Sequence, residues 1–254
     1  MSEWASEWVS VSISQWWPAW STDWLSYRPG DFLMFAPRTY WRLFERHNQS
    51  VGPAIWLIWA LGLAALWRLR RPNPSLRALE VSLALALAWA AVGWYFLHQL
   101  YAPVFWVMTW AAWAFLTQAL LLGGMAVLAL SKRGTPRHAE HAAPSLRNGG
   151  LVLVGWAVLI HPLLAPLAER PWAQAEIIGL APDPTVFATL GLLLCMRPPA
   201  GAARVPYELM WALALAWCAV SAATLWTMSS MQAYVPVLVG AGALAWRIRH
   251  GKPR

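Results

Sequence analysis

The sequence predicts an all-α membrane protein: a bundle of about seven transmembrane helices preceded by Trp-rich interfacial helices. Two observations carry this prediction. Hydrophobic residues make up 59% of the 254 residues and charged residues only 12%, whereas a soluble domain has about 45–50% apolar and about 25% charged residues. The apolar residues also gather in runs close to the length that spans a bilayer, and most basic residues lie between these runs.

This composition excludes an ordinary soluble enzyme, a disordered chain and a nucleic-acid-binding domain. The formal net charge of +8 could indicate a nucleic-acid partner. We expect none, because the basic residues lie in short segments between apolar runs. The two cysteines, Cys195 and Cys218, both lie inside apolar runs, which excludes a disulfide framework and a cysteine-built zinc site.

Residues 1–50 predict an extracytoplasmic, amphipathic, Trp-rich segment. Five of its tryptophans are separated by multiples of four residues: Trp4, Trp8, Trp16, Trp20 and Trp24. Residues spaced in this way share one helix face, and a tryptophan face is typical of a helix lying at the membrane surface. Such a face could instead dock a partner or an aromatic ligand. Pro37 favours a second short helix, which either lies at the interface or covers the outer mouth of the bundle.

Residues 51–248 predict the helical bundle, and residues 249–254 predict a basic cytoplasmic tail. A transmembrane helix needs about 20 mostly apolar residues. The seven candidate spans are residues 51–67, 79–98, 103–130, 150–167, 184–196, 206–226 and 233–246. The fifth is short, so it either crosses with little tilt, re-enters, or extends into the loop before it.

The basic residues predict the orientation, because Lys and Arg in short loops mark the cytoplasmic side. Fourteen of the nineteen fall in alternate loops and the tail: Arg68, Arg70, Arg71, Arg77, Lys132, Arg133, Arg137, Arg147, Arg197, Arg204, Arg247, Arg249, Lys252 and Arg254. With seven spans, all of these lie on one side. We therefore expect a cytoplasmic C-terminus and an N-terminus outside.

Two stretches carry a resemblance to a known family: DFLMFAPRTYWRLFERHN at residues 31–48 and GLAPDPTVFATLGLLL at residues 179–194. Together they resemble an uncharacterised family of bacterial integral membrane proteins, a domain of unknown function. The resemblance implies a multi-pass protein of the bacterial inner (plasma) membrane and no known activity.

Few residues could carry chemistry in the predicted spans. Neither lysine lies in a span, which excludes a retinal Schiff base. No charged residue lies in the middle of a span, which argues against a proton-coupled pump or a voltage sensor. Gly123, Gly124, Gly240 and Gly242 would allow close helix approach.

The candidate ligand-binding residues are Trp94, His98, His161 and Asp183. Each histidine follows a Val-Gly-Trp and precedes an Ala-Pro in its span, so both are expected at the outer end. The pair could bind a metal, haem or a quinone; alternatively, each histidine bonds to backbone or water. Asp183 lies in Pro-Asp-Pro-Thr, where it could cap a helix that begins at Pro184.

These patterns lead to two functional expectations. The first is a transporter, permease or channel for a small neutral or aromatic solute. The alternative is an accessory or assembly subunit of a larger membrane complex, perhaps a redox one. A membrane enzyme ranks third, because an enzyme needs reactive groups and only His98, His161 and nearby outer acids could supply them. We assign no catalytic or metal-binding residue. The expected partners are the lipid bilayer and either a second copy or other membrane subunits.

Overall fold

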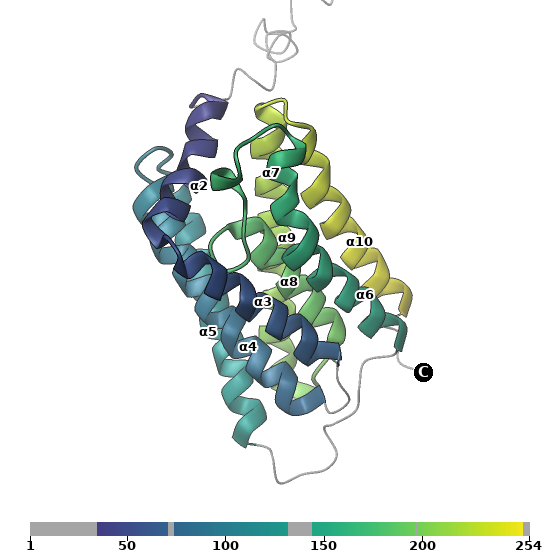
Figure 1. The fold of residues 1–254 in the computed structure, drawn as a ribbon. Helices are drawn as coiled ribbons and strands as arrows, with labels where there is room; N and C mark the ends of the chain where they lie inside the picture. Colours follow the sequence, from purple (N-terminus) through teal and green to yellow (C-terminus); the bar gives the residue numbers. More distant parts are fainter. Residues whose placement is uncertain (1–34, 71–73, 132–143, 197, 251–254) are drawn as a thin grey trace, which may run out of the picture.

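The computed structural model describes residues 35–70, 74–131, 144–196 and 198–250, and this part of the chain is all-α, as expected (Figure 1). Its longer helices are α2 (Pro37–Val51), α3 (Ala54–Arg70), α4 (Pro74–Ala91), α5 (Met108–Ser131), α6 (Pro144–Gly155), α8 (Pro182–Cys195), α9 (Arg204–Thr227) and α10 (Tyr234–His250). The Trp-rich stretch before residue 35 lies outside the described residues.

Several of these helices are long and apolar enough to cross a membrane. Four helical segments qualify on length and composition: Glu80–Tyr101, Met108–Val127, Pro144–Leu167 and Gly201–Thr227. Helices α2 and α3 together give a fifth, bent by 98° at Gly52, which has a φ of +57°, and Pro53, which cannot continue a helical hydrogen-bond ladder. The chain therefore has the helices of a multi-pass membrane protein. The runs predicted at 51–67, 184–196 and 233–246 are mostly helical, as α3, α8 and α10.

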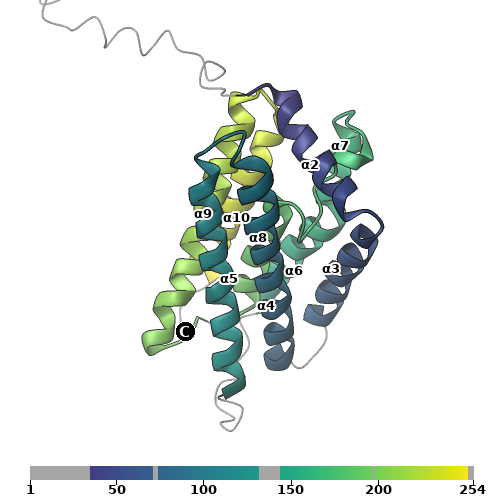
Figure 2. The same cartoon turned by 90° about the vertical axis from the view of Figure 1, so that its left-hand side faces the viewer.

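Helix α2 packs on the bundle and does not stand apart from it. Its buried residues follow a helical spacing of three and four: Tyr40, Leu43, Phe44, His47 and Asn48. Asn48 Nδ2 donates hydrogen bonds to the carbonyls of Ala173 (2.8 Å) and Ala175 (2.9 Å). This part of the 1–50 segment is thus built into the helical body, at the same end as α7 (Leu164–Leu167), as Figures 1 and 2 show.

The opposite end of the bundle gathers basic residues from several helices. Arg147 at the start of α6 donates to the Arg70 carbonyl at the end of α3 (2.7 Å). Arg247 near the end of α10 pairs with Glu208 near the start of α9 (2.6 and 2.5 Å). Trp246 Nε1 donates to the Ser145 carbonyl (3.0 Å), which joins α10 to α6.

Helix α8 lies in the centre of the bundle. Every residue from Pro182 to Leu194 is buried, as expected for a helix that is apolar on all sides. It packs against α4, α6, α9 and α10. Its 14 residues span only about 21 Å, so it is too short to cross a bilayer core alone.

The segment before α8, residues 168–181, runs from the α7 end into the interior and contains the short η7 (Trp172–Gln174) (Figure 1). The short fifth apolar run is thus preceded by a largely non-helical segment whose last residues are buried. Gly179 makes the final turn with a φ of +81°. Its N–H donates to Thr185 Oγ1 (2.9 Å), and this hydroxyl donates to the Ala181 carbonyl (2.8 Å). These bonds satisfy backbone groups that apolar surroundings would leave unpaired.

Helices α6 and α8 approach each other closely at Gly150 and Gly191. A Cβ atom on Gly191 would lie 2.6 Å from the Gly150 carbonyl oxygen. Gly123, Gly124 and Gly242, predicted to mediate such contacts, have open space where a Cβ would stand, and only Gly240 of the predicted four faces a neighbour closely. Hydropathy cannot distinguish these positions, because the face a glycine presents depends on how its helix is rotated.

Candidate functional site

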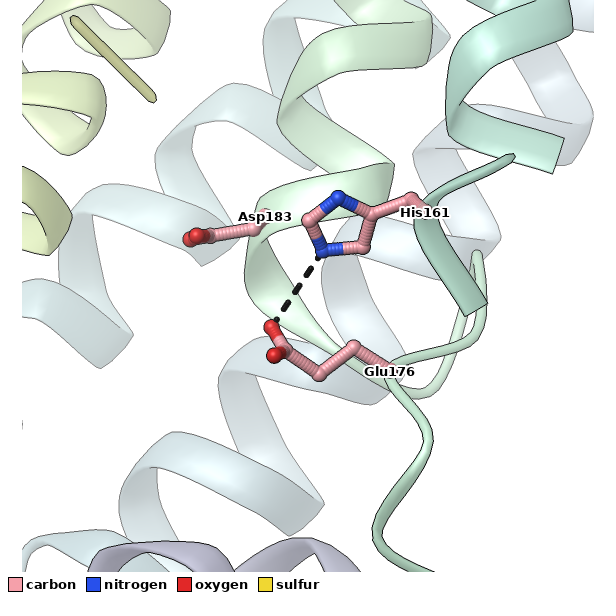
Figure 3. A group of neighbouring side chains, drawn as sticks. All are labelled: His161, Glu176 and Asp183. Atoms are coloured by element: carbon pink, nitrogen blue, oxygen red, sulfur yellow. Dashed lines mark hydrogen bonds and ion pairs between the residues drawn. The ribbon is translucent and has the colours of Figure 1, made fainter. Parts of the chain in front are cut away.

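Three buried side chains lie close together at the N-terminal end of α8: His161, Glu176 and Asp183. Figure 3 shows His161 and Glu176 facing each other, with the Asp183 carboxylate directed to one side. Each offers one ligand atom, and these atoms all lie within 4.8 Å of one another. The exposed fractions of the residues are 3%, 6% and 3%. His161 Nε2 lies 3.4 Å from Glu176 Oε2. We call these three residues the His-Glu-Asp cluster.

His161 is positioned by an interruption of its helix. Helix α6 continues as a π-helical turn, η5 (Trp156–Ile160), and then as a 3₁₀ turn, η6 (His161–Leu163). Pro162 lacks the N–H that a regular helix needs at this point. The imidazole packs edge-on against Phe187 of α8, with ring centroids 5.3 Å apart. The histidine therefore faces the interior of the bundle.

Asp183 does not cap α8, contrary to the sequence prediction. The helix begins one residue earlier, at Pro182, and Ala181 takes the cap position without a side-chain hydrogen bond. Proline suits the first helical position because its φ is already helical. Asp183 thus lies in the first turn, where the helix dipole favours an acid.

The Asp183 carboxylate is held by α9. Trp217 Nε1 donates to Oδ1 and Ser221 Oγ donates to Oδ2, both at 2.7 Å. Because a carboxylate has about four lone-pair positions, each oxygen can accept one further partner.

Arg170 supplies a positive charge beside Glu176. Its Nη2 lies 3.7 Å from Glu176 Oε1 and donates to Gln232 Oε1 (3.0 Å). The guanidinium also stacks on the ring of Trp41, 3.5 Å from the centroid, which links the loop to α2. Burial lowers the pKa of Arg170 and Glu176 raises it. Since arginine stays protonated in proteins, two carboxylates and one guanidinium give the site a net charge of −1 when the imidazole is neutral.

Two buried tyrosines lie near the site. The rings of Tyr40 and Tyr101 are 5.7 Å apart, and both side chains are close enough to Asp183 to interact with it electrostatically. The Tyr101 hydroxyl is buried and has no hydrogen-bond partner within the described residues.

The structure brings two of the four predicted residues together and leaves the other two elsewhere. His161 and Asp183 belong to the cluster, whereas Trp94 is 43% exposed and stacks on His98 (5.0 Å between ring centroids). They lie on η3 (Val92–Tyr101), which packs against α2, α4 and α5. A haem or metal held jointly by His98 and His161 therefore has no support in this geometry. Similar sequence surroundings placed both histidines near a helix end but did not determine which face each occupies.

No charged residue lies in the middle of a predicted span, yet the interior of the bundle contains two acids. Glu176 and Asp183 are both buried inside the bundle. Asp183 was among the candidate residues, but Glu176 was not, because it lies outside every apolar run. Glu176 enters on the non-helical segment and Asp183 on the first turn of a half-length helix. The sequence does contain a sign of these buried acids. Two oppositely charged residues, Arg170 and Glu176, lie between apolar runs in a short segment that ends in Pro-Asp-Pro.

Comparison with known proteins gives one match. No curated protein and no solved structure matches the chain. A family model described as a family of unknown function (DUF6064) matches residues 38–249, which include the whole His-Glu-Asp cluster. This is in line with the resemblance drawn from the two sequence stretches. The chain therefore belongs to DUF6064, a family of unknown function whose helices here are those of a multi-pass membrane protein.

Proposed function

We propose that the chain is a seven-span protein of the bacterial inner membrane with its C-terminus in the cytoplasm. Each of the seven apolar runs is largely helical, and basic residues of α3, α6, α9 and α10 gather at one end. Positively charged loops favour the cytoplasmic side. The opposite end, with α2 and α7, then faces outward.

This orientation predicts the behaviour of C-terminal fusions in bacterial cells. A fluorescent protein that matures only in the cytoplasm, fused after Arg254, is expected to be bright, whereas alkaline phosphatase at the same position is expected to be inactive. The same pair inserted between Ala168 and Trp172, in the proposed outer loop, should give the reverse result. Phosphatase activity at the C-terminus would contradict the orientation.

The function that the geometry supports best is transport: a permease or channel that binds its solute at the N-terminal end of α8. One observation carries this proposal. Residues 168–181 bring non-helical backbone into the bundle, and this segment ends at a half-length helix beside buried charged groups. In membrane proteins, irregular backbone at depth is tolerated where protein buries it or where it lines a water-filled cavity. Half-length helices frequently point at substrate sites in transporters.

The charges of the site favour a cationic solute. Glu176 and Asp183 outnumber Arg170, so the site carries excess negative charge when His161 is neutral. A second negative charge at the start of α8 would disfavour an anion despite the helix dipole. The neutral or aromatic solute expected from the sequence would leave this charge unbalanced, and an unbalanced buried charge is costly.

Transport is tested by flux into liposomes that contain the purified protein. The panel is H⁺, Na⁺, K⁺, methylammonium and Mn²⁺, each followed by a dye or isotope. At least one cation is expected to enter faster than into empty liposomes, and Asp183→Asn should slow it by at least about tenfold, which corresponds to ~1.4 kcal/mol. Glu169→Gln, which changes an exposed acid near the same end, should keep the wild-type rate. Equal rates with and without protein across the panel would reject this function.

A subunit of a larger complex remains the second candidate, because one face of the chain is unusually aromatic. Trp110 and Trp113 are exposed and three residues apart at the start of α5, and Trp106 is exposed in the turn that precedes this helix. A partner helix could cover these side chains. Extraction in mild detergent from the native membrane separates the two candidates: a stoichiometric partner favours the subunit, and the chain alone favours transport.

A further inference from the structure

The donor atoms of the His-Glu-Asp cluster match the preferences of a particular class of ion. His161 supplies an imidazole nitrogen, and Glu176 and Asp183 supply carboxylate oxygens. Imidazole favours first-row transition metals, whereas all-oxygen sites favour Mg²⁺ or Ca²⁺. One nitrogen with two carboxylates is a donor set that Zn²⁺ and its neighbours accept.

The spacing of the donors suits a shared ion as well as a direct contact. A charged N–H···O⁻ hydrogen bond is normally about 2.7–2.9 Å long, but His161 Nε2 and Glu176 Oε2 are 3.4 Å apart. Two ligands bound about 2.0–2.2 Å from one zinc ion at the tetrahedral angle lie about 3.4 Å from each other. The Asp183 ligand atom lies within 4.8 Å of both.

A second observation also indicates a missing ligand. The Tyr101 hydroxyl and His161 Nδ1 are both buried without a hydrogen-bond partner in the described part of the chain. Buried polar groups in native proteins nearly always have a partner. Tyr101 is also close enough to Asp183 to interact with it electrostatically. A water molecule on such an ion would offer the Tyr101 hydroxyl a partner, whereas Nδ1 points away from an ion bound at Nε2.

The surroundings hold two of the donors in place. Trp217 and Ser221 fix the Asp183 carboxylate through one hydrogen bond to each oxygen. Arg170 faces the other oxygen of Glu176, so that Oε2 stays directed at His161. Such outer partners orient metal ligands and are part of a working site.

We propose that His161, Glu176 and Asp183 bind one divalent first-row transition-metal ion, such as Zn²⁺, in the interior of the bundle. Three protein ligands leave at least one coordination position for water or a solute, which is the pattern of an exchangeable site and not of a closed structural one. Movement of the ion across the membrane rests on the proposed transport function, but its binding does not.

Binding is tested on the full-length chain in mild detergent. The protein is stripped with a chelator and titrated with Zn²⁺ at neutral pH against a chromophoric competitor, and bound metal is measured by mass spectrometry after desalting. One Zn²⁺ per chain is expected. His161→Ala, Glu176→Gln and Asp183→Asn should each weaken binding by at least about tenfold. His98→Ala is the matched control, because it removes a histidine outside the cluster, and it should bind like the wild type.

Replacement of Zn²⁺ by Co²⁺ gives a second readout. The wild type and His98→Ala should show the visible absorption of Co²⁺ bound to nitrogen and oxygen, and His161→Ala should lose it. Where a variant does not elute as one folded species, Glu176→Gln decides, because it keeps the size of the side chain. Absence of a stoichiometric ion, or equal affinity in wild type and cluster variants, overturns the proposal. Metal binding without any cation flux would leave this site standing and reject transport instead.

Discussion

Gly191→Ala is expected to lower the stability of the protein by about 3 kcal/mol, at the upper end of what overpacking costs. The added Cβ would lie 2.6 Å from the Gly150 carbonyl oxygen and 3.0 Å from the Val154 backbone nitrogen. Both are backbone atoms of α6, so no side-chain rotation can relieve the clash. Helix α6 would have to move away from the central helix α8, which would open the core along this crossing.

The measurement is thermal denaturation in detergent, followed by the loss of the folded peak in size-exclusion chromatography. A loss of this size should lower the midpoint by roughly 6–12 °C, because 1 kcal/mol shifts a protein of this length by about 2–4 °C. Gly123→Ala is the control: it also replaces a glycine within a helix, but no atom lies within 4 Å of its Cβ position. That variant should keep or raise the midpoint, since alanine has the better helix propensity. Equal losses in both variants would contradict the close crossing.

Asp183→Ala is expected to cost about 2–5 kcal/mol, because it leaves two buried donors without an acceptor. Trp217 Nε1 and Ser221 Oγ both donate to this carboxylate, and each unsatisfied buried group costs about 1–3 kcal/mol. Removal of excess negative charge offsets part of the loss. Measurements in the presence of a chelator separate these hydrogen bonds from any contribution of a bound ion.

A double-mutant cycle with Trp217→Phe isolates the indole contact. Phenylalanine keeps an aromatic ring at this position but removes the N–H donor. Once Asp183 is absent, loss of that donor should cost less, so the two changes should couple by about 0.5–3 kcal/mol. Val220→Ala on the exposed face of α9 is the control and should be additive with Asp183→Ala. Additivity within about 0.5 kcal/mol for Asp183 and Trp217 would show that their hydrogen bond contributes little.

The sequence alone predicted the all-α class and the positions of the helices. Both depend on runs of apolar residues that are local in the chain, so they can be recognised without knowledge of packing. The same locality explains why His161 and Asp183 were singled out: a histidine in an apolar run and an acid between two prolines stand out in their immediate surroundings. It also explains why Trp94 and His98 were grouped with them, since their surroundings in the sequence look alike.

Only the tertiary structure decided which of these residues meet. Glu176 and Arg170 reach the site on a loop whose path depends on anchors far away in the chain, such as Asn48, whose side chain bonds the loop at Ala173 and Ala175. Asp183 is held by Trp217, 34 residues later. Hydropathy determines that a segment is helical and buried, but the rotation of a helix and the course of a loop follow from contacts between distant segments. For that reason the sequence determined the membrane bundle, and the packing around α8 determined the polar site within it.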